Sequence, residues 1–261
     1  MPGTSPIDHV PLWLLFIAIA VMVAISIEAG YRIGRYRSRH SKDERESPVG
    51  AIVGASLGLL GFILAFTFGL AASRFDERRR IVVQEANAIG TTYLRAGLLP
   101  GDSTKSIRKL LEEYTDARLE VTKTRDIPLL MQRSEELHEK LWKEGERVGN
   151  GNPQSIVVGL FLESLNETID VHAERVLIAV RNRLPTAIWI SLFFVTVITM
   201  GGVGYHEGLS KSRRSPAILV LVFSFSLVIT LISDLDRPQD GYLRVSQEAM
   251  IELQRMIQQH P

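Results

Sequence analysis

Residues 49–73 read VGAIVGASLGLLGFILAFTFGLAAS, a run of 25 residues without a charged side chain. A mainly apolar run of about 18 residues or more is long enough to cross a hydrocarbon layer about 30 Å thick as a helix. Three further windows, at residues 10–27, 184–205 and 215–233, also lack Asp, Glu, Lys and Arg. The four windows predict four transmembrane helices and exclude a soluble cytoplasmic protein.

The bulk composition hides this uneven placement of charge. The chain has 261 residues, of which 46% are hydrophobic and 23% are charged, and its formal net charge is +1. A nucleic-acid-binding protein needs a net basic face, so this balance argues against nucleic acid as a partner. Because the chain has no cysteine, disulfides, thiolate catalysis and cysteine-ligated metal sites are excluded as well.

The sequence carries no recognisable catalytic or cofactor-binding motif. Its six histidines lack H-E-x-x-H or any other metal-ligand spacing. A glycine-rich phosphate loop followed by Lys, a G-x-S-x-G elbow and a kinase signature are also missing. We therefore predict no enzyme activity, no cofactor and no metal site.

The first apolar window is predicted to be a retained membrane anchor rather than a signal peptide. A secretory signal opens with basic residues, but residues 1–10 carry no Lys or Arg. The loop at residues 31–48 and the link at residues 204–214 are both basic, which places both on the cytoplasmic side. The N-terminus, residues 74–183 and the C-terminal tail would then lie on the opposite side.

The four windows divide the chain into four parts. Residues 1–73 hold the first two transmembrane helices, residues 74–183 form an extramembrane helical domain, residues 184–233 hold the third and fourth transmembrane helices, and residues 234–261 form a turn and an amphipathic helix. No window shows sustained β alternation. The predicted fold class is an all-α integral membrane protein with four transmembrane helices and a helical domain between the second and third.

The second helix is predicted to leave the membrane as one long rod. Its helical pattern continues unbroken to residue 98, where Leu99-Pro100-Gly101 forms a stop signal. About four helices are expected in the domain, with residues 149–153 (GNGNP) as its clearest loop. The C-terminal helix, which follows a turn at residues 237–241, is expected to dock on the protein rather than on lipid, because its polar face is not markedly basic.

A stripe of small residues runs down one face of the second transmembrane helix. Small side chains let helix backbones approach closely, which is how helices associate in lipid. We therefore expect a partner helix on this face, either within the chain or in a neighbouring subunit. The stripe consists of Gly50, Gly54, Gly58, Gly61, Ala65 and Gly69.

Aromatic and hydroxyl side chains in the membrane windows are the candidate pore residues. Phe62 and Phe66 lie four residues apart on the second helix, and copies from several subunits would form a hydrophobic constriction that gates by dewetting. Lipid-facing packing is the alternative. Thr67 on the same helix, and Ser226 and Thr230 on the fourth, would face a water-filled path or bond back to their own helix carbonyls.

Charged residues outside the membrane windows also have two interpretations. Arg78, Glu85 and Asn87 lie among apolar positions of the second helix, and would bind an ion or pair with charges on adjacent helices. An acidic stripe in the domain would be a solvated face or a cation site, and the solvated face is favoured. The stripe consists of Glu163, Glu167, Asp170 and Glu174.

Three stretches resemble the bestrophin-like domain family of bacterial membrane proteins. They are EAGYRIGR at residues 28–35, GFILAFTFGLAASRFDERRRIVVQEANAIGTTYLRAGLLP at residues 61–100, and SDLDRPQDGYLRVSQEAM at residues 233–250. The resemblance implies a multi-pass protein of the bacterial cytoplasmic membrane. The polar residues of these motifs are Glu28, Arg74, Asp76, Arg78, Glu85, Asn87, Asp234, Asp236 and Arg237.

The family is named for its similarity to bestrophins, which are pentameric anion channels with a pore lined by the second of four transmembrane helices. The resemblance thus implies a homo-oligomer in a lipid bilayer that passes small anions, with Phe62 and Phe66 at a constriction and Gly58 and Gly61 on the packing side of the same helix. In bestrophins the helical domain is cytoplasmic, whereas the short basic loops place it outside here.

A second function class competes with the channel. A non-conducting sensor or scaffold would bind a ligand or a partner protein through its helical domain and transmit a movement to the membrane. The absence of a charged residue from the middle of the second membrane window favours this alternative.

Overall fold

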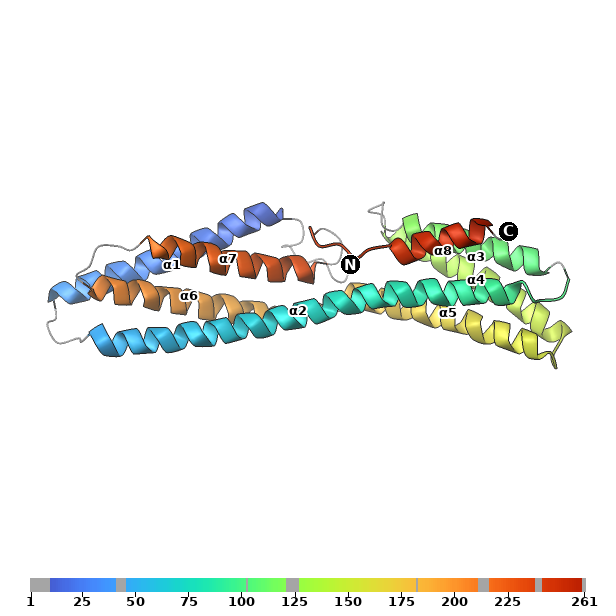
Figure 1. The fold of residues 1–261 in the computed structure, drawn as a ribbon, viewed down its shortest axis with the longest axis horizontal. Coiled ribbons are helices and arrows are strands. Elements are labelled where there is room, and N and C mark those ends of the chain that lie inside the picture. Colours follow the sequence, from blue (N-terminus) through green and yellow to red (C-terminus); the bar gives the residue numbers. More distant parts are fainter. Residues whose placement is uncertain are drawn as a thin grey trace. The chain divides into compact units, whose positions relative to one another are not determined.

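The computed structural model describes residues 10–40, 46–101, 103–120, 127–181, 183–210, 216–237 and 241–259, and every regular element in these ranges is an α-helix (Figure 1). The chain divides into two compact units. Unit 1 holds residues 1–75 and 183–244, and unit 2 holds residues 76–182 and 245–261. The helices are α1 (Leu12–His40), α2 (Glu46–Ala96), α3 (Ser103–Glu120), α4 (Ile127–Gly151), α5 (Ile156–Arg181), α6 (Thr186–Leu209), α7 (Ala217–Asp236) and α8 (Glu248–Gln259).

Unit 1 contains the four predicted membrane segments. Helices α1, α2, α6 and α7 are long and apolar enough to cross a membrane, as the four uncharged windows predicted. Helix α2 has 51 residues and is therefore about 75 Å long. That length exceeds the thickness of a membrane, which agrees with the expectation that only its uncharged part, residues 49–73, lies in lipid.

The closest helix crossing in unit 1 joins α1 to α6, which lie side by side in Figure 1. A Cβ atom added to Gly30 or Gly34 on α1 would overlap the backbone of α6, and one added to Gly204 or Gly208 on α6 would overlap the backbone of α1. Glycine is required at all four positions because the two backbones touch. These four glycines are separate from the predicted stripe on α2, for which a partner helix stays a prediction.

An apolar core holds unit 1 together around this crossing. Val23 on α1, Leu60 on α2, Leu192 and Met200 on α6 and Ile229 on α7 are fully buried in it. Each of the four helices therefore contributes to the same core, although α2 does so with only one of its faces.

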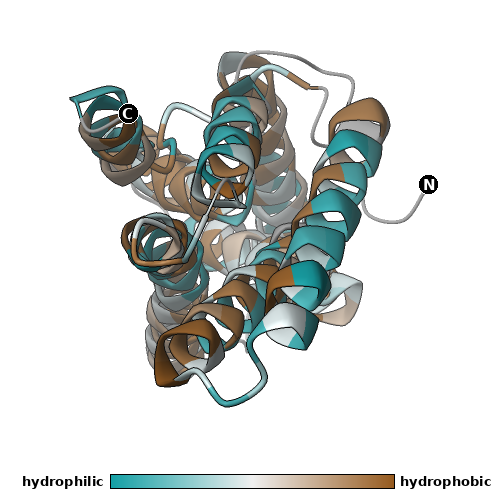
Figure 2. Ribbon diagram, turned by 90° about the vertical axis from the view of Figure 1, so that its right-hand side faces the viewer, coloured by the Kyte–Doolittle hydropathy of each residue, from teal (hydrophilic) through white to brown (hydrophobic). Residues whose placement is uncertain are grey.

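Unit 2 consists of α3, α4, α5, α8 and the part of α2 that follows Phe75. Its core contains the fully buried side chains of Tyr93 on α2, Tyr114 on α3 and Phe161 on α5. In Figure 2, which faces this unit, its helices carry both teal and brown bands, as amphipathic helices do. The one-sided apolar faces of these helices explain why they assemble around a core rather than in lipid.

The C-terminal helix α8 docks on unit 2, as its apolar face predicted. Met250, Leu253 and Ile257 are buried in the core of the unit. The amide nitrogen of Gln254 donates a hydrogen bond of 2.6 Å to Asp116 on α3. This docking excludes the alternative in which the helix lies on the lipid surface.

Two predicted loops are largely helical. Helix α4 runs to Gly151, so GNGNP is a turn only from Asn152 onward. One turn earlier on α4, a Cβ at Gly145 would lie 2.9 Å from the Leu162 side chain on α5, so glycine there permits close packing. Helix α1 likewise continues to His40, so most of the basic loop at residues 31–48 is helix, and Arg37, Arg39 and His40 in its last turn complement the negative helix end.

Parts of three predicted segments lie outside the described residues. They are residues 41–45 of the first basic loop, residues 211–215 of the second, and residues 238–240 of the turn before the C-terminal helix.

Candidate functional site

The membrane part of α2 has an open apolar face. The Phe62 side chain is 69% exposed and the Phe66 side chain is 62% exposed, although both lie in the middle of the longest apolar run of the chain. The glycine stripe is open as well, since within the described ranges no atom lies within 4 Å of a Cβ added to Gly54, Gly58 or Gly61. The same is true of Gly69, and only Gly50, which faces the His206 ring, is close to another helix.

This open face separates the candidate pore residues into two groups. Phe62 and Phe66 lie on it, but Thr67 is buried and its hydroxyl bonds back to the carbonyl of Ile63 at 2.7 Å. Ser226 is fully buried on α7, and Thr230 donates a 2.7 Å bond to the Ser226 carbonyl. The hydroxyl groups of Thr67 and Thr230 thus satisfy themselves within their own helices, which was the alternative interpretation.

The acidic residues at the end of α7 hold the chain in place where it leaves the helix. Buried Asp234 accepts backbone hydrogen bonds from Tyr242 at 2.8 Å and Leu243 at 3.2 Å, and Gly241 beside it leaves no space for a side chain. Asp236 accepts a 2.8 Å bond from the backbone nitrogen of Leu184. These two motif residues therefore have a structural role. Asp234 holds the segment that follows α7, and Asp236 holds the segment that precedes α6.

A buried polar centre lies in unit 2, around Glu85 on α2. The Glu85 side chain is completely buried, and it pairs with Arg175 on α5 and with Arg118 on α3, whose Nε lies 2.9 Å from Glu85 Oε1. Arg175 also donates a 3.2 Å hydrogen bond to Gln247, just before α8. One carboxylate thus ties α2 to α3 and α5, and Arg175 extends the connection to the segment that carries α8.

Two histidines and a tyrosine complete this centre. The Tyr114 hydroxyl donates to Glu85 Oε1 at 2.9 Å, and lies 2.9 Å from His172 Nδ1. The His138 ring on α4 packs with its centroid 4.6 Å from that of Tyr114 and 4.7 Å from that of His172. We call Glu85, Tyr114, Arg118, His138, His172 and Arg175 the Glu85 centre.

The surroundings of the Glu85 centre shift its ionisation. Burial raises the pKa of Glu85, but Arg175, His172 and Arg118 together hold the pKa of this carboxyl well below its ordinary value. Burial, followed by the negative charge of Glu85, raises the pKa of Tyr114. Burial, and after it the neighbouring His172, lowers the pKa of His138 to about 4. At neutral pH the centre therefore holds one carboxylate, two guanidiniums and an uncharged His138.

The remaining motif residues range from exposed to buried. Glu28 forms a 2.8 Å ion pair with Arg32 one turn later on α1. Asp76 and Asn87 are exposed, Arg74 is half-buried, and Arg78 and Arg237 are buried.

The four residues of the acidic stripe on α5 are all exposed, as a solvated face requires. Across the part of the chain that the structure describes, no group of three or more His, Asp or Glu side chains is arranged to hold a metal ion.

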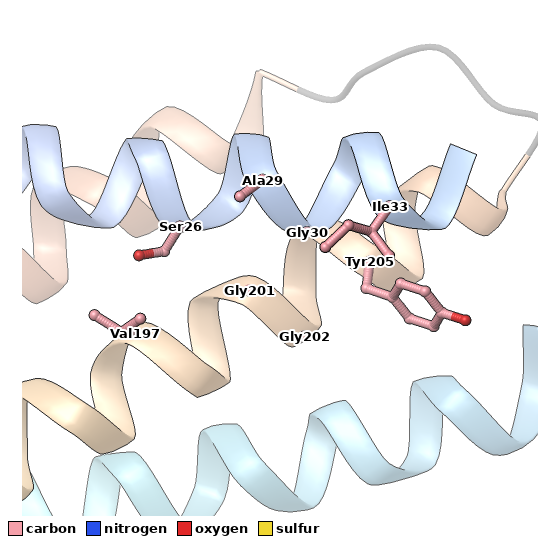
Figure 3. Close-up of a pocket in the computed structure, with 8 residues that line it drawn as sticks. All are labelled: Ser26, Ala29, Gly30, Ile33, Val197, Gly201, Gly202 and Tyr205. Atoms are coloured by element: carbon pink, nitrogen blue, oxygen red, sulfur yellow. The ribbon is translucent and has the colours of Figure 1, made fainter. Parts of the chain in front are cut away.

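A shallow groove of about 320 Å³ lies along the α1–α6 crossing (Figure 3). Ser26, Ala29, Gly30 and Ile33 line it from α1, and Val197, Gly201, Gly202 and Tyr205 line it from α6. Its walls are almost wholly apolar because glycine replaces larger side chains on both helices. The groove therefore offers contact for apolar groups rather than a polar or catalytic site.

The family assignment agrees with this arrangement of helices. The Bestrophin-like domain family matches the chain over residues 15–250. The chain belongs to the bestrophin-like domain family. The match covers both units, so the four membrane helices, the helical domain and the start of α8 are all parts of the bestrophin-like fold.

Solved structures show the same fold for this bestrophin-like protein. A point variant of a bacterial bestrophin homologue from Klebsiella pneumoniae has a TM-score of 0.69 at 16% identity, over 95% of this chain and 98% of the other. A second variant of that homologue has a TM-score of 0.68 at 16% identity, over 94% and 97%. A crystal structure described as a membrane protein has a TM-score of 0.65 at 17% identity, over 95% and 97%. Among curated proteins, no sequence matches the chain.

Sequence reasoning found only part of the Glu85 centre of this bestrophin-like protein. It singled out Glu85 and expected it to pair with charges on adjacent helices, which the structure confirms. It missed the other five residues of the Glu85 centre, because each lies on another helix, and Arg175 is 90 residues away along the chain. One signal was present in the sequence, since His138 falls on the apolar side of an amphipathic helix, as do Tyr114 and His172. The partners are Tyr114, Arg118, His138, His172 and Arg175.

Proposed function

We propose that this bestrophin-like membrane protein is an oligomeric ion channel whose pore is lined by the membrane part of α2. The observation that supports the proposal is the open face of α2, where Phe62 and Phe66 are both more than 60% exposed. A membrane helix can expose apolar side chains to lipid, but a long stripe of glycines on the same helix is typical of contact with another helix. A second copy of the chain supplies that contact.

The arrangement of side chains on α2 suits a narrow apolar constriction. Rings of Phe62 and Phe66 from several copies would exclude water at rest, and a hydrophobic constriction gates by wetting and dewetting. Beyond the uncharged part, α2 carries exposed Asp76, Arg79 and Arg80, so its exposed charges there are mainly positive. This balance favours small anions as the permeant species.

Ion flux through purified protein in lipid vesicles tests the pore. Replacing Phe62 or Phe66 with Ala removes a bulky apolar group from the constriction, so we expect ion flux to rise severalfold while the oligomer stays intact. Phe194→Ala is the matched control, because Phe194 is 64% exposed on α6 rather than on α2. A KCl gradient across a planar bilayer gives the sign of the permeant ion through the reversal potential. Unchanged flux in both α2 variants would count against the pore.

A non-conducting sensor or scaffold is the second candidate. It is favoured by the charge-free middle of α2 and by the presence of an ionised centre in unit 2 rather than along the membrane segments. Absence of ion flux from the unaltered protein, together with recovery of a specific ligand or partner bound to residues 74–183, would support the sensor and exclude the channel.

A further inference from the structure

The Glu85 centre draws side chains from four helices of unit 2 into one water-excluded cluster. Glu85 comes from α2, Tyr114 and Arg118 from α3, His138 from α4, and His172 and Arg175 from α5. A change in charge within the cluster therefore alters the electrostatic interactions of all four helices. In a buried site such a change is expensive, because charges there are only weakly screened by water.

The hydrogen-bond pattern settles where the protons lie at neutral pH. The single Tyr114 hydroxyl proton goes to Glu85 Oε1, so the Tyr114 oxygen accepts from His172 Nδ1. His172 Nδ1 therefore carries a hydrogen in this arrangement. Among the described residues, the buried Nε2 of His138 has no hydrogen-bond partner. A buried polar atom without a partner is costly, and is a reason to look for a function.

The charged groups that face His138 come from three helices. From α3 it faces Arg118 and the uncharged Tyr114, from α5 His172, and from α2 Glu85, which also pairs with Arg175. On α4 itself the nearest titratable side chains in the sequence, Glu136, Glu139 and Lys140, are exposed to water. Within the described part of the centre, one carboxylate thus lies among two guanidiniums before His138 takes up a proton.

We propose that the Glu85 centre is a proton sensor of unit 2, in which acidification places a charge on His138 and loosens the packing of α4 against α2, α3 and α5. The new charge lies beside Arg118 and His172, and Glu85 is already engaged by both arginines. Repulsion is relieved only when α4 moves away and lets water reach the imidazole. Since Glu85 belongs to α2, the loosening acts on the helix that runs from unit 2 into the membrane.

The direction of the pH effect follows from the pKa of His138. An unfolded histidine titrates near pH 6.5, whereas burial lowers the pKa of folded His138 to about 4. Between these two values the unfolded segment binds a proton that the folded one does not, so stability falls as the pH drops through this window. Glu85 remains ionised there because its pKa is well below the ordinary value. The effect of His138 is therefore separate from acid loss of the Glu85 ion pairs.

Hydrogen–deuterium exchange of the full-length protein in detergent tests the proposal. Between about pH 7.5 and about pH 5, after correction for the intrinsic pH dependence of exchange, the opening equilibrium of α4 should rise by up to roughly 30-fold. His138→Phe removes the titrating group and its unpaired nitrogen while keeping a planar ring, so the pH-dependent part should disappear. His206→Gln, at a half-buried histidine of unit 1, should keep it. Persistence of the full pH dependence in His138→Phe would overturn the sensor.

A measurement on the unaltered protein covers the case in which His138→Phe does not fold. Exchange of the imidazole C2 hydrogen, followed peptide by peptide in mass spectrometry, reports the pKa of each histidine without a substitution. A midpoint well below 6.5 for the peptide that contains His138 is expected. A midpoint near 6.5 would mean that the folded protein tolerates the charge, and the proposal would be wrong. Both measurements are independent of ion flux. A negative result in them would overturn the proton sensor without affecting the proposed pore, and absence of ion flux would overturn the pore without affecting the sensor.

Discussion

At the scale of single residues, Glu85 is the position on which unit 2 depends most. Its two carboxylate oxygens accept from Tyr114 and pair with both Arg118 and Arg175, and the Glu85 side chain itself is completely buried. A buried ion pair adds little net stability when it forms, because desolvation offsets most of the attraction. Removing one partner is different, since it leaves the other charges buried and uncompensated.

We predict that Glu85→Gln strongly destabilises the protein. The neutral amide leaves two buried guanidiniums without a counter-charge, and breaking a buried pair in this way costs about 3–5 kcal/mol. Thermal unfolding in detergent measures the effect. Glu167→Gln, at an exposed position on α5, is the control and should unfold within about 0.5 kcal/mol of the unaltered protein. Equal losses in the two variants would show that the Glu85 pairs do not support the fold.

At the scale of elements, the α1–α6 crossing determines how the membrane helices assemble. Gly30 and Gly34 on α1 meet Gly204 and Gly208 on α6 with the two backbones in contact. In lipid the hydrophobic effect does not drive helices together, so such close contact provides much of their attraction. A side chain of any size at the crossing forces the helices apart and weakens all of that contact.

Gly204→Ala should therefore destabilise unit 1. The added methyl group would overlap the Ile27 carbonyl oxygen, and overpacking of this kind typically costs about 1–3 kcal/mol. Gly159→Ala on α5 is the matched control, because nothing lies within 4 Å of its Cβ in the described structure, and alanine favours a helix over glycine. Denaturant titration in detergent micelles compares the two. A Gly204 variant as stable as the Gly159 variant would rule out the tight crossing.

At the scale of the whole molecule, the open face of α2 supports the proposal that several copies of the chain assemble. Gly54, Gly58, Gly61 and Gly69 have free space beside them in a single copy, and Phe62 and Phe66 are exposed next to them. A pore lined by one helix per chain needs several copies around an axis, and closed cyclic symmetry is the usual solution.

We predict a closed ring of several copies, about five, of the 29.2 kDa chain. Light scattering coupled to size exclusion, with the detergent contribution subtracted, gives the protein mass of the particle. Gly58→Phe places a large ring in the predicted contact and should reduce that mass to the mass of smaller assemblies, whereas Gly159→Phe should not. A monomer or dimer for the unaltered chain would leave α2 without a ring to line, and would favour the sensor.

Much of the architecture follows from patterns that are local in the sequence. Transmembrane segments are predictable because lipid admits only continuous apolar stretches with satisfied backbones, and the length of α2 follows from an unbroken helical pattern up to Leu99-Pro100-Gly101. The glycines were harder to interpret. The stripe on α2 has the periodicity of a packing face, but within one chain the tight contact is made by two shorter patterns. They are the G-x-x-x-G pairs Gly30 with Gly34 and Gly204 with Gly208.

The sequence alone therefore predicts the number and apolar character of the membrane helices, the long extension of α2 and the family, because each depends on neighbours in the chain. The sequence does not predict the pairing of α1 with α6 or the hydrogen bonds that Asp234 makes to the following turn. Nor does it predict the convergence of Glu85, Tyr114, His138 and Arg175. These depend on contacts between residues far apart in the chain, such as Gly30 with Gly201 and Glu85 with Arg175. Only the packing of whole helices selects such contacts, because many other charged and small residues offer the same local pattern.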